Sequence, residues 1–117
     1  MKTLSIDEFD LLNFFETIPD RPEPDEPWLY DDSSYGASDA HVRISFGVTP
    51  WIRFVTVILR TSSEAIVYKL IAKEVDDVKY HNDRGRESLE VIVSARESIW
   101  IRIKPAISVN HTIAEPE

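Results

Sequence analysis

The stretch from residue 51 to residue 60, Trp-Ile-Arg-Phe-Val-Thr-Val-Ile-Leu-Arg, constrains the fold more than any other part of the chain. It is rich in β-branched and aromatic side chains, which suit the pleated surface of a sheet. Successive strand residues point to opposite faces, and both faces are largely apolar here. We therefore expect a central strand over residues 51–60 with a layer packed on each side. Arg53 is the exception, and it should reach an edge of the sheet or pair with a carboxylate.

Residues 5–16 are predicted to form an amphipathic helix that covers one side of this strand. Ser5 is a suitable N-cap, and Glu8 three residues later completes a capping box. Apolar residues recur at helical spacing through the segment, and polar residues fill the opposite face. The other side of the central strand should receive part of the segment 28–35.

Alternating apolar and polar residues predict further strands after residue 40. Short turns separate these strands, which indicates an antiparallel meander, because parallel strands need long crossovers. The segment 65–72 has a strand pattern that extends with a bulge to residue 80, and a helix over 69–79 is the alternative there. The polar cluster at 81–86 predicts a turn. The remaining strands are expected at 40–48, 88–93 and 99–104.

Together these elements predict an α+β fold, namely a twisted antiparallel meander sheet of five to six strands with one N-terminal helix packed on a face. A chain of 117 residues is long enough for one domain. Within that single domain, 1–117, we expect the helix at 5–16, an acidic, proline-rich loop region at 19–39 and the sheet at 40–109.

The net charge of −8 comes from the first third of the chain. Residues 1–40 hold 2 basic and 11 acidic residues, whereas residues 41–117 hold 11 basic and 10 acidic residues. Such a field repels nucleic acid and anionic membranes and attracts a basic partner, although solubility alone also explains it. No segment has the apolar run of a signal peptide or the ~20 apolar residues of a membrane span, so a cytoplasmic location is expected.

Aromatic residues are interleaved with these acidic residues, which predicts a protein-binding surface. Tyrosine and tryptophan anchors ringed by charges are typical of tight interfaces. Four of the seven prolines lie between residues 19 and 27 and stiffen the backbone, so less entropy is lost on docking. The predicted partner-binding residues are Asp20, Glu23, Asp25, Glu26, Tyr30, Asp31, Asp32, Tyr35 and Asp39.

The sequence predicts no catalytic, cofactor-binding or metal-binding site, and we expect that the protein is not an enzyme. The chain has no cysteine. Residues 31–39 resemble a calcium loop only in part, because Tyr35 and Val42 stand where a calcium loop needs oxygen ligands. His81 lies beside Asp83 in a polar segment and is expected to be solvated rather than to act in acid–base catalysis.

Three segments carry a resemblance to a known family: Glu-Pro-Trp-Leu-Tyr-Asp-Asp-Ser at 26–33, Ser-Phe-Gly-Val-Thr-Pro at 45–50 and Ile-Lys-Pro at 103–105. With the layout of a helix followed by a meander, they resemble the small acidic immunity proteins of bacterial polymorphic-toxin systems, of the contact-dependent growth inhibition and Rhs type. The resemblance implies a cytoplasmic, non-enzymatic inhibitor that binds the C-terminal domain of one cognate toxin, often a basic nuclease. No functional residue can be assigned from this resemblance.

Two other functions stay open at this point. One is a structural or adaptor module that acts by homo-oligomerisation, and the other is a small-molecule-binding domain. The sequence leaves both a monomer and a homodimer open, and it predicts no binding of nucleic acid or membrane.

Overall fold

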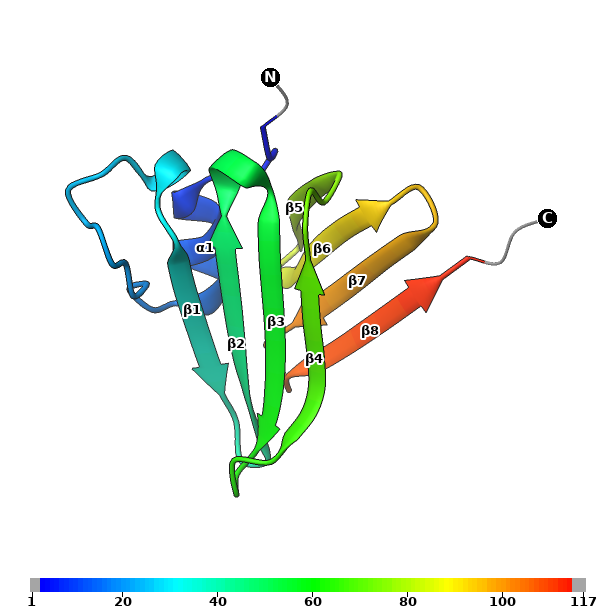
Figure 1. The fold of residues 1–117 in the computed structure, drawn as a ribbon. Helices are drawn as coiled ribbons and strands as arrows, with labels where there is room; N and C mark the ends of the chain where they lie inside the picture. The colour runs from blue at the N-terminus through cyan, green and yellow to red at the C-terminus, as the bar shows by residue number, and fades with distance from the viewer. Residues whose placement is uncertain (1–2, 115–117) are drawn as a thin grey trace.

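The computed structural model describes residues 3–114, which form one helix and two four-stranded antiparallel sheets (Figure 1). The strand order is β1-β2-β3-β4 in the first sheet and β5-β6-β7-β8 in the second. Residues 1–2 and 115–117 of the predicted domain lie outside the described part. The elements are α1 (Glu8–Phe15), the 3₁₀ turns η1 (Trp28–Tyr30) and η2 (Pro50–Ile52), β1 (Ser33–Ser38), β2 (Val42–Thr49), β3 (Phe54–Thr61), β4 (Ile66–Ala72), β5 (Asp77–Asp83), β6 (Arg86–Ser94), β7 (Glu97–Arg102) and β8 (Ser108–Ile113).

The prediction of one sheet with five to six strands is wrong, because the chain changes sheet between β4 and β5. Glu74 adopts a left-handed conformation (φ 52°), and the buried Val75 donates its N–H to the carbonyl of Arg53 at 3.0 Å. Ala72, Val75 and Val78 are all buried, and their spacing of three residues cannot belong to one regular strand. Both the continuous strand to residue 80 and the alternative helix over 69–79 are therefore incorrect.

The predicted central strand is internal to the first sheet, between β2 and β4, but it starts at Phe54 rather than at residue 51. The left-handed Arg53 (φ 52°) separates the η2 turn from β3, so Arg53 does not lie on a strand face. Only one face of β3 is covered: Val55 and Val57 are fully buried, while Ile58 on the opposite face is partly exposed. The expectation of a layer on each side is thus wrong.

The helix is shorter than predicted and starts later. Asp7, not Ser5, is the N-cap, and it forms a reciprocal capping box with Asp10. Ser5 instead fastens the N-terminal segment to the second sheet, since its N–H donates to the Asp77 carboxylate at 2.7 Å. Glu16 ends the helix in a left-handed conformation. Rather than covering β3, α1 contacts β1, β5 and β6, so it bridges the two sheets on one side of the molecule (Figure 1).

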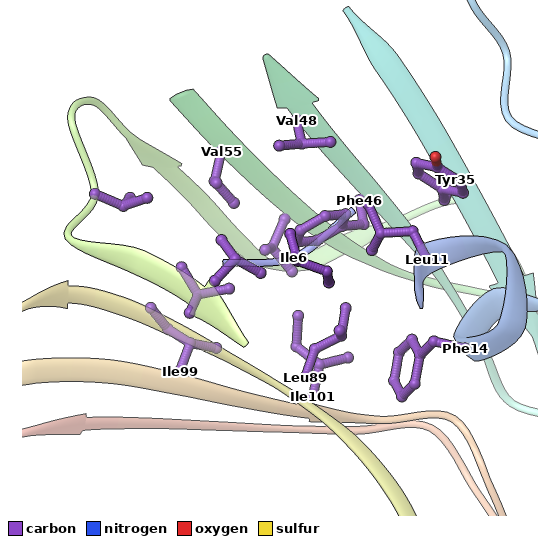
Figure 2. Close-up of a cluster of buried hydrophobic side chains, with 14 of the residues drawn as sticks. Ile6, Leu11, Phe14, Tyr35, Phe46, Val48, Val55, Leu89, Ile99 and Ile101 are labelled. Carbon is purple, nitrogen blue, oxygen red and sulfur yellow. The ribbon is translucent and has the colours of Figure 1, made fainter. Parts of the chain in front are cut away.

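One hydrophobic cluster fills the space that the two sheets and the helix enclose (Figure 2). Phe14 lies edge-to-face against Tyr80 with ring centroids 6.3 Å apart, and Phe15 stacks on Tyr35 at 5.5 Å. These ring pairs connect the helix to both sheets. The other fully buried members of the cluster are Leu11, Ile44, Phe46, Val55, Val57, Val75, Val78, Leu89, Val91, Ile99 and Ile101.

Two segments that were expected to be irregular are strands. Residues 33–38 form β1, which pairs with β2, and the buried Ser33 and Tyr35 point into the core. At the other predicted turn, His81 lies on β5, and only Arg84 and Gly85 turn the chain. Both of these residues have positive φ, 54° and 87°, which is the backbone that a two-residue hairpin loop requires.

Candidate partner-binding surface

The two 3₁₀ turns bring an exposed aromatic pair together at one end of the first sheet. Tyr30 belongs to η1, directly before β1, and Trp51 belongs to η2, which joins β2 to β3. Their ring centroids are 5.0 Å apart with an interplanar angle of 52°. Tyr30 is 53% exposed, Trp51 is 42% exposed and the neighbouring Ile52 is 52% exposed. These three side chains form an apolar surface, which we call the aromatic surface.

A partly buried ion pair holds the loop that leads to η1. Arg21 Nε donates to Asp31 Oδ2 at 3.0 Å, and a second guanidinium nitrogen donates to the carbonyl of Glu26. The Asp31 side chain is only 3% exposed and that of Arg21 is 18% exposed. Asp31 also accepts the N–H of Asp32 at 2.8 Å. The pair therefore joins two residues ten positions apart in sequence and sets the position at which η1 begins.

The start of β1 is fixed by two further contacts. The backbone groups of Asp20 and Ser34 exchange two hydrogen bonds of 2.9 Å, which places the loop along the outer edge of β1. Trp28 Nε1 donates to the Tyr35 hydroxyl at 3.2 Å, so Trp28 anchors η1 to the core. The pKa of Tyr35 is raised, mainly because burial disfavours its charged form.

Two of the predicted partner-binding residues are buried, and a third has a structural role. Tyr35 is 1% exposed and Asp31 is 3% exposed, so neither side chain can reach a partner. Asp39 is exposed, but its carboxylate is occupied by three backbone N–H groups. His41 and Val42 donate to one oxygen at 2.8 and 2.9 Å, and Ile107 donates to the other at 3.0 Å.

The role of Asp39 is to tie the two sheets together. It closes the β1–β2 turn through its own neighbours and holds the segment before β8 through Ile107. The N–H groups of His41, Ile107 and Val42 lower the pKa of the carboxyl to about 2. Asp39 therefore has a structural role as a hydrogen-bond acceptor.

The other predicted carboxylates are exposed and lie in the segment that leads to the aromatic surface. Asp32 is the first residue after the buried Asp31, and its carboxylate accepts a hydrogen bond from the Thr49 hydroxyl, directly before η2. The exposed set consists of Asp20, Glu23, Asp25, Glu26 and Asp32.

Sequence reasoning missed Trp51 and Ile52, because it placed both residues inside the central strand. The signal that separates them from the strand is Pro50, which favours the first position of a helical turn and cannot donate to a sheet ladder. Reading Thr49 and Pro50 as the start of a turn of several residues would have exposed Trp51 and moved the strand to Phe54.

A hollow with apolar and charged lining residues lies on the same loop region. It has a volume of about 510 Å³ and is lined by the apolar Leu12, Ile18, Pro19 and Pro24 and by the charged Glu8, Asp20 and Arg21. Ile18 is 90% exposed. The loop thus offers an exposed apolar contact beside its carboxylates, as interfaces commonly do.

His81 of the second sheet is accessible to solvent, with 41% of its side chain exposed, and it also has neighbours in the fold. His81 Nε2 lies 3.0 Å from Glu90, and its ring stacks on Trp100 with centroids 5.0 Å apart. Its hydrogen-bond partner is Glu90 and not Asp83, which lies two residues away in the sequence. Within residues 3–114, no group of three or more histidine, aspartate or glutamate side chains is arranged to hold a metal ion. The same residues include no helix with the length and apolar character needed to cross a membrane.

Comparisons with known proteins show a likeness in structure. No model of a known protein family matches the chain, and no curated protein sequence matches it. The fold is similar to that of a chain in a solved contact-dependent growth inhibition toxin–immunity protein complex from Klebsiella pneumoniae 342. The two chains share 22% sequence identity, the TM-score is 0.76, and the match covers 92% of this chain and 93% of the other.

Proposed function

We propose that this chain is an immunity protein that binds and neutralises a cognate bacterial toxin domain. The observation that carries the proposal is the likeness in fold to a chain of a toxin–immunity protein complex over 92% of the present chain. A small acidic protein with an exposed aromatic pair suits the inhibitor in such a complex better than the toxin, because the inhibitor needs a binding surface and no reaction centre.

The proposed contact is the aromatic surface together with the exposed carboxylates of the neighbouring loop. Tyr30 and Trp51 would act as anchors, because tyrosine and tryptophan supply a large contact area at a low cost in conformational entropy. The carboxylates would attract a basic partner and speed its capture. A basic nuclease is the toxin class that fits this charge, and cytoplasmic action without enzymatic activity follows from the same proposal.

Co-expression with the C-terminal domain of the protein encoded immediately upstream, as the candidate toxin domain, tests the proposal. Cells that make the toxin domain should survive only when this chain is present, and the two purified proteins should form a complex. Expression of this chain alone should leave growth unchanged. Growth inhibition by the chain alone would identify it as the toxin instead, and failure to protect or to bind would refute the proposed function.

Matched charge variants test the location of the contact. The variant Glu23→Gln, Asp25→Asn, Glu26→Gln removes three exposed carboxylates of the loop and should slow association at least about tenfold. The control Glu64→Gln, Glu74→Gln, Asp83→Asn removes three exposed carboxylates elsewhere and should leave the association rate near that of the wild type. Equal rates in the two variants would exclude the loop as the contact.

A further inference from the structure

A carboxylate joins the two turns that carry the aromatic surface. Figure 1 shows η1 in cyan and η2 in green side by side at one end of the first sheet, and the two turns contact each other. The Thr49 hydroxyl, directly before η2, donates to Oδ1 of Asp32, which follows Tyr30 by two residues. Thr49 in turn precedes Trp51 by two residues. The charge of Asp32 therefore lies at the border of the aromatic surface.

Asp32 has no counter-charge in the part of the chain that the structure describes. Its neighbour Asp31 is buried and paired with Arg21, whereas Asp32 is exposed. No lysine or arginine among residues 3–114 forms an ion pair with Asp32. Arg53 follows Trp51 by two residues, and it also has no ion pair among these residues. The Asp32 carboxylate thus depends on water for its solvation.

A partner that covers Tyr30 and Trp51 also removes water from Asp32, because this carboxylate joins the turns that carry the two rings. Burying a carboxylate without a counter-charge is strongly unfavourable. An apolar side chain on the rings would leave Asp32 in that state, whereas a cation would neutralise it. The face of an aromatic ring also attracts a cation, and tryptophan attracts it most. The rings and the carboxylate therefore favour the same kind of ligand.

We propose that the toxin residue on the aromatic surface is an arginine, which stacks its guanidinium on the Trp51 indole beside Tyr30 and pairs with the Asp32 carboxylate. This inference rests on the function proposed above and names the side chain that the surface receives. Arginine suits the site better than lysine, because a planar guanidinium can lie on a ring face and direct its N–H groups at a carboxylate at the same time. Oδ1 of Asp32 is engaged by Thr49, so Oδ2 is available to the guanidinium.

Double-mutant cycles on the complex of the full chain with the candidate toxin domain test the proposal. Each arginine and lysine of the toxin domain is replaced by methionine, which keeps an unbranched stem and removes the charge. One arginine-to-methionine variant should weaken binding at least about tenfold in calorimetry. This loss should be at least about threefold smaller when the present chain carries Asp32→Asn, and likewise when it carries Trp51→Leu.

The two substitutions in the present chain are chosen to preserve the shape of the surface. Asparagine keeps a carbonyl acceptor for the Thr49 hydroxyl and removes only the charge. Leucine at position 51 keeps an apolar side chain and removes the aromatic face. The control Glu64→Gln removes an exposed carboxylate elsewhere, and the loss caused by the arginine substitution should be unchanged in that background. Circular dichroism of each variant checks that the fold is intact.

The outcomes separate this inference from the proposed function. A complex in which no arginine of the toxin domain couples to both Asp32 and Trp51 would overturn the inference and leave the proposed function intact. Coupling of a lysine in place of an arginine would also overturn it. The absence of binding between the two wild-type proteins would instead refute the proposed function, and the inference would fall with it.

Discussion

Removal of the Arg21 side chain tests whether the buried ion pair holds the binding loop. In Arg21→Ala, the Asp31 carboxylate, 3% exposed, keeps only the N–H of Asp32 as a donor. Breaking a fully buried pair costs about 3–5 kcal/mol. Arg21 is 18% exposed, so water can reach the vacated position, and we expect the free energy of unfolding to fall by about 2–3 kcal/mol.

The reciprocal change and the double variant separate the pair from its surroundings. Asp31→Ala removes the charge-assisted bond and the acceptor of the Asp32 N–H, which should cost about 2 kcal/mol. Arg21 then still has the carbonyl of Glu26 as an acceptor. Both single changes remove the same contact. The free energy of unfolding should therefore fall less in the double variant than the sum of the two single effects, by about 1–2 kcal/mol.

Urea unfolding followed by circular dichroism measures these values, and the melting temperature should fall by about 4 °C for each kcal/mol. The exposed pair of Arg43 with Glu64, whose side chains are 50% and 60% exposed, is the control. Its double-mutant cycle should give a coupling of no more than about 0.5 kcal/mol. A coupling for Arg21 and Asp31 as small as that of the control would refute the view that burial makes this pair structural.

Three further outcomes are expected. Tyr30→Ala and Trp51→Ala should each weaken toxin binding by about 1.4 kcal/mol or more, tenfold in the dissociation constant measured by calorimetry, and change the unfolding free energy by less than about 1 kcal/mol. Phe14→Ala removes a fully buried ring and should cost about 3–5 kcal/mol in urea unfolding. The Asp39 carboxyl has its pKa lowered from 3.8 to about 2 in the folded chain, so its contribution to stability is present above pH 4 and is lost as the pH falls toward 2. Asp39→Asn should therefore flatten the decline in stability between pH 4 and pH 2, and an unchanged slope would contradict that role.

Sequence patterns predicted the elements whose burial follows a strict period. Ile44, Phe46 and Val48 alternate as expected and are buried in β2, and Ile99 and Ile101 do the same in β7. The pattern failed at β1, because serine and glycine make up most of Ser33–Ser38 and only Tyr35 is a large inward residue. That strand owes its place to pairing with β2, which no local pattern reveals.

The division into two sheets was also beyond the sequence pattern. A meander of short strands is compatible with one sheet or with two sheets packed face to face, and the choice depends on what the inward residues contact. In this chain the change of sheet occurs at residues 73–76. There Val75 is buried in the core, and its N–H donates a hydrogen bond to the carbonyl of Arg53, which is distant in sequence.

The candidate site was predicted in composition but not in detail. The acidic loop is exposed as expected, and Tyr30 is half exposed. However, the exposure of a side chain depends on its neighbours in the fold. The sequence does not show that the Asp31 carboxylate is buried against Arg21, or that the Tyr35 hydroxyl accepts a hydrogen bond from Trp28. Trp51 was missed for the converse reason, since a tryptophan next to a strand pattern was taken for a core residue.

The position of α1 between the two sheets has a consequence for the order of assembly during translation. The helix is synthesised before β5 and β6, which it contacts, and β6 ends at Ser94. At about 5–20 residues per second, some 80 residues of synthesis separate the two, roughly 4 to 16 s. During this interval Phe14 lacks the second sheet, whose Tyr80 it contacts in the folded chain. A nascent chain stalled shortly after β4 should therefore be the species that chaperones recognise.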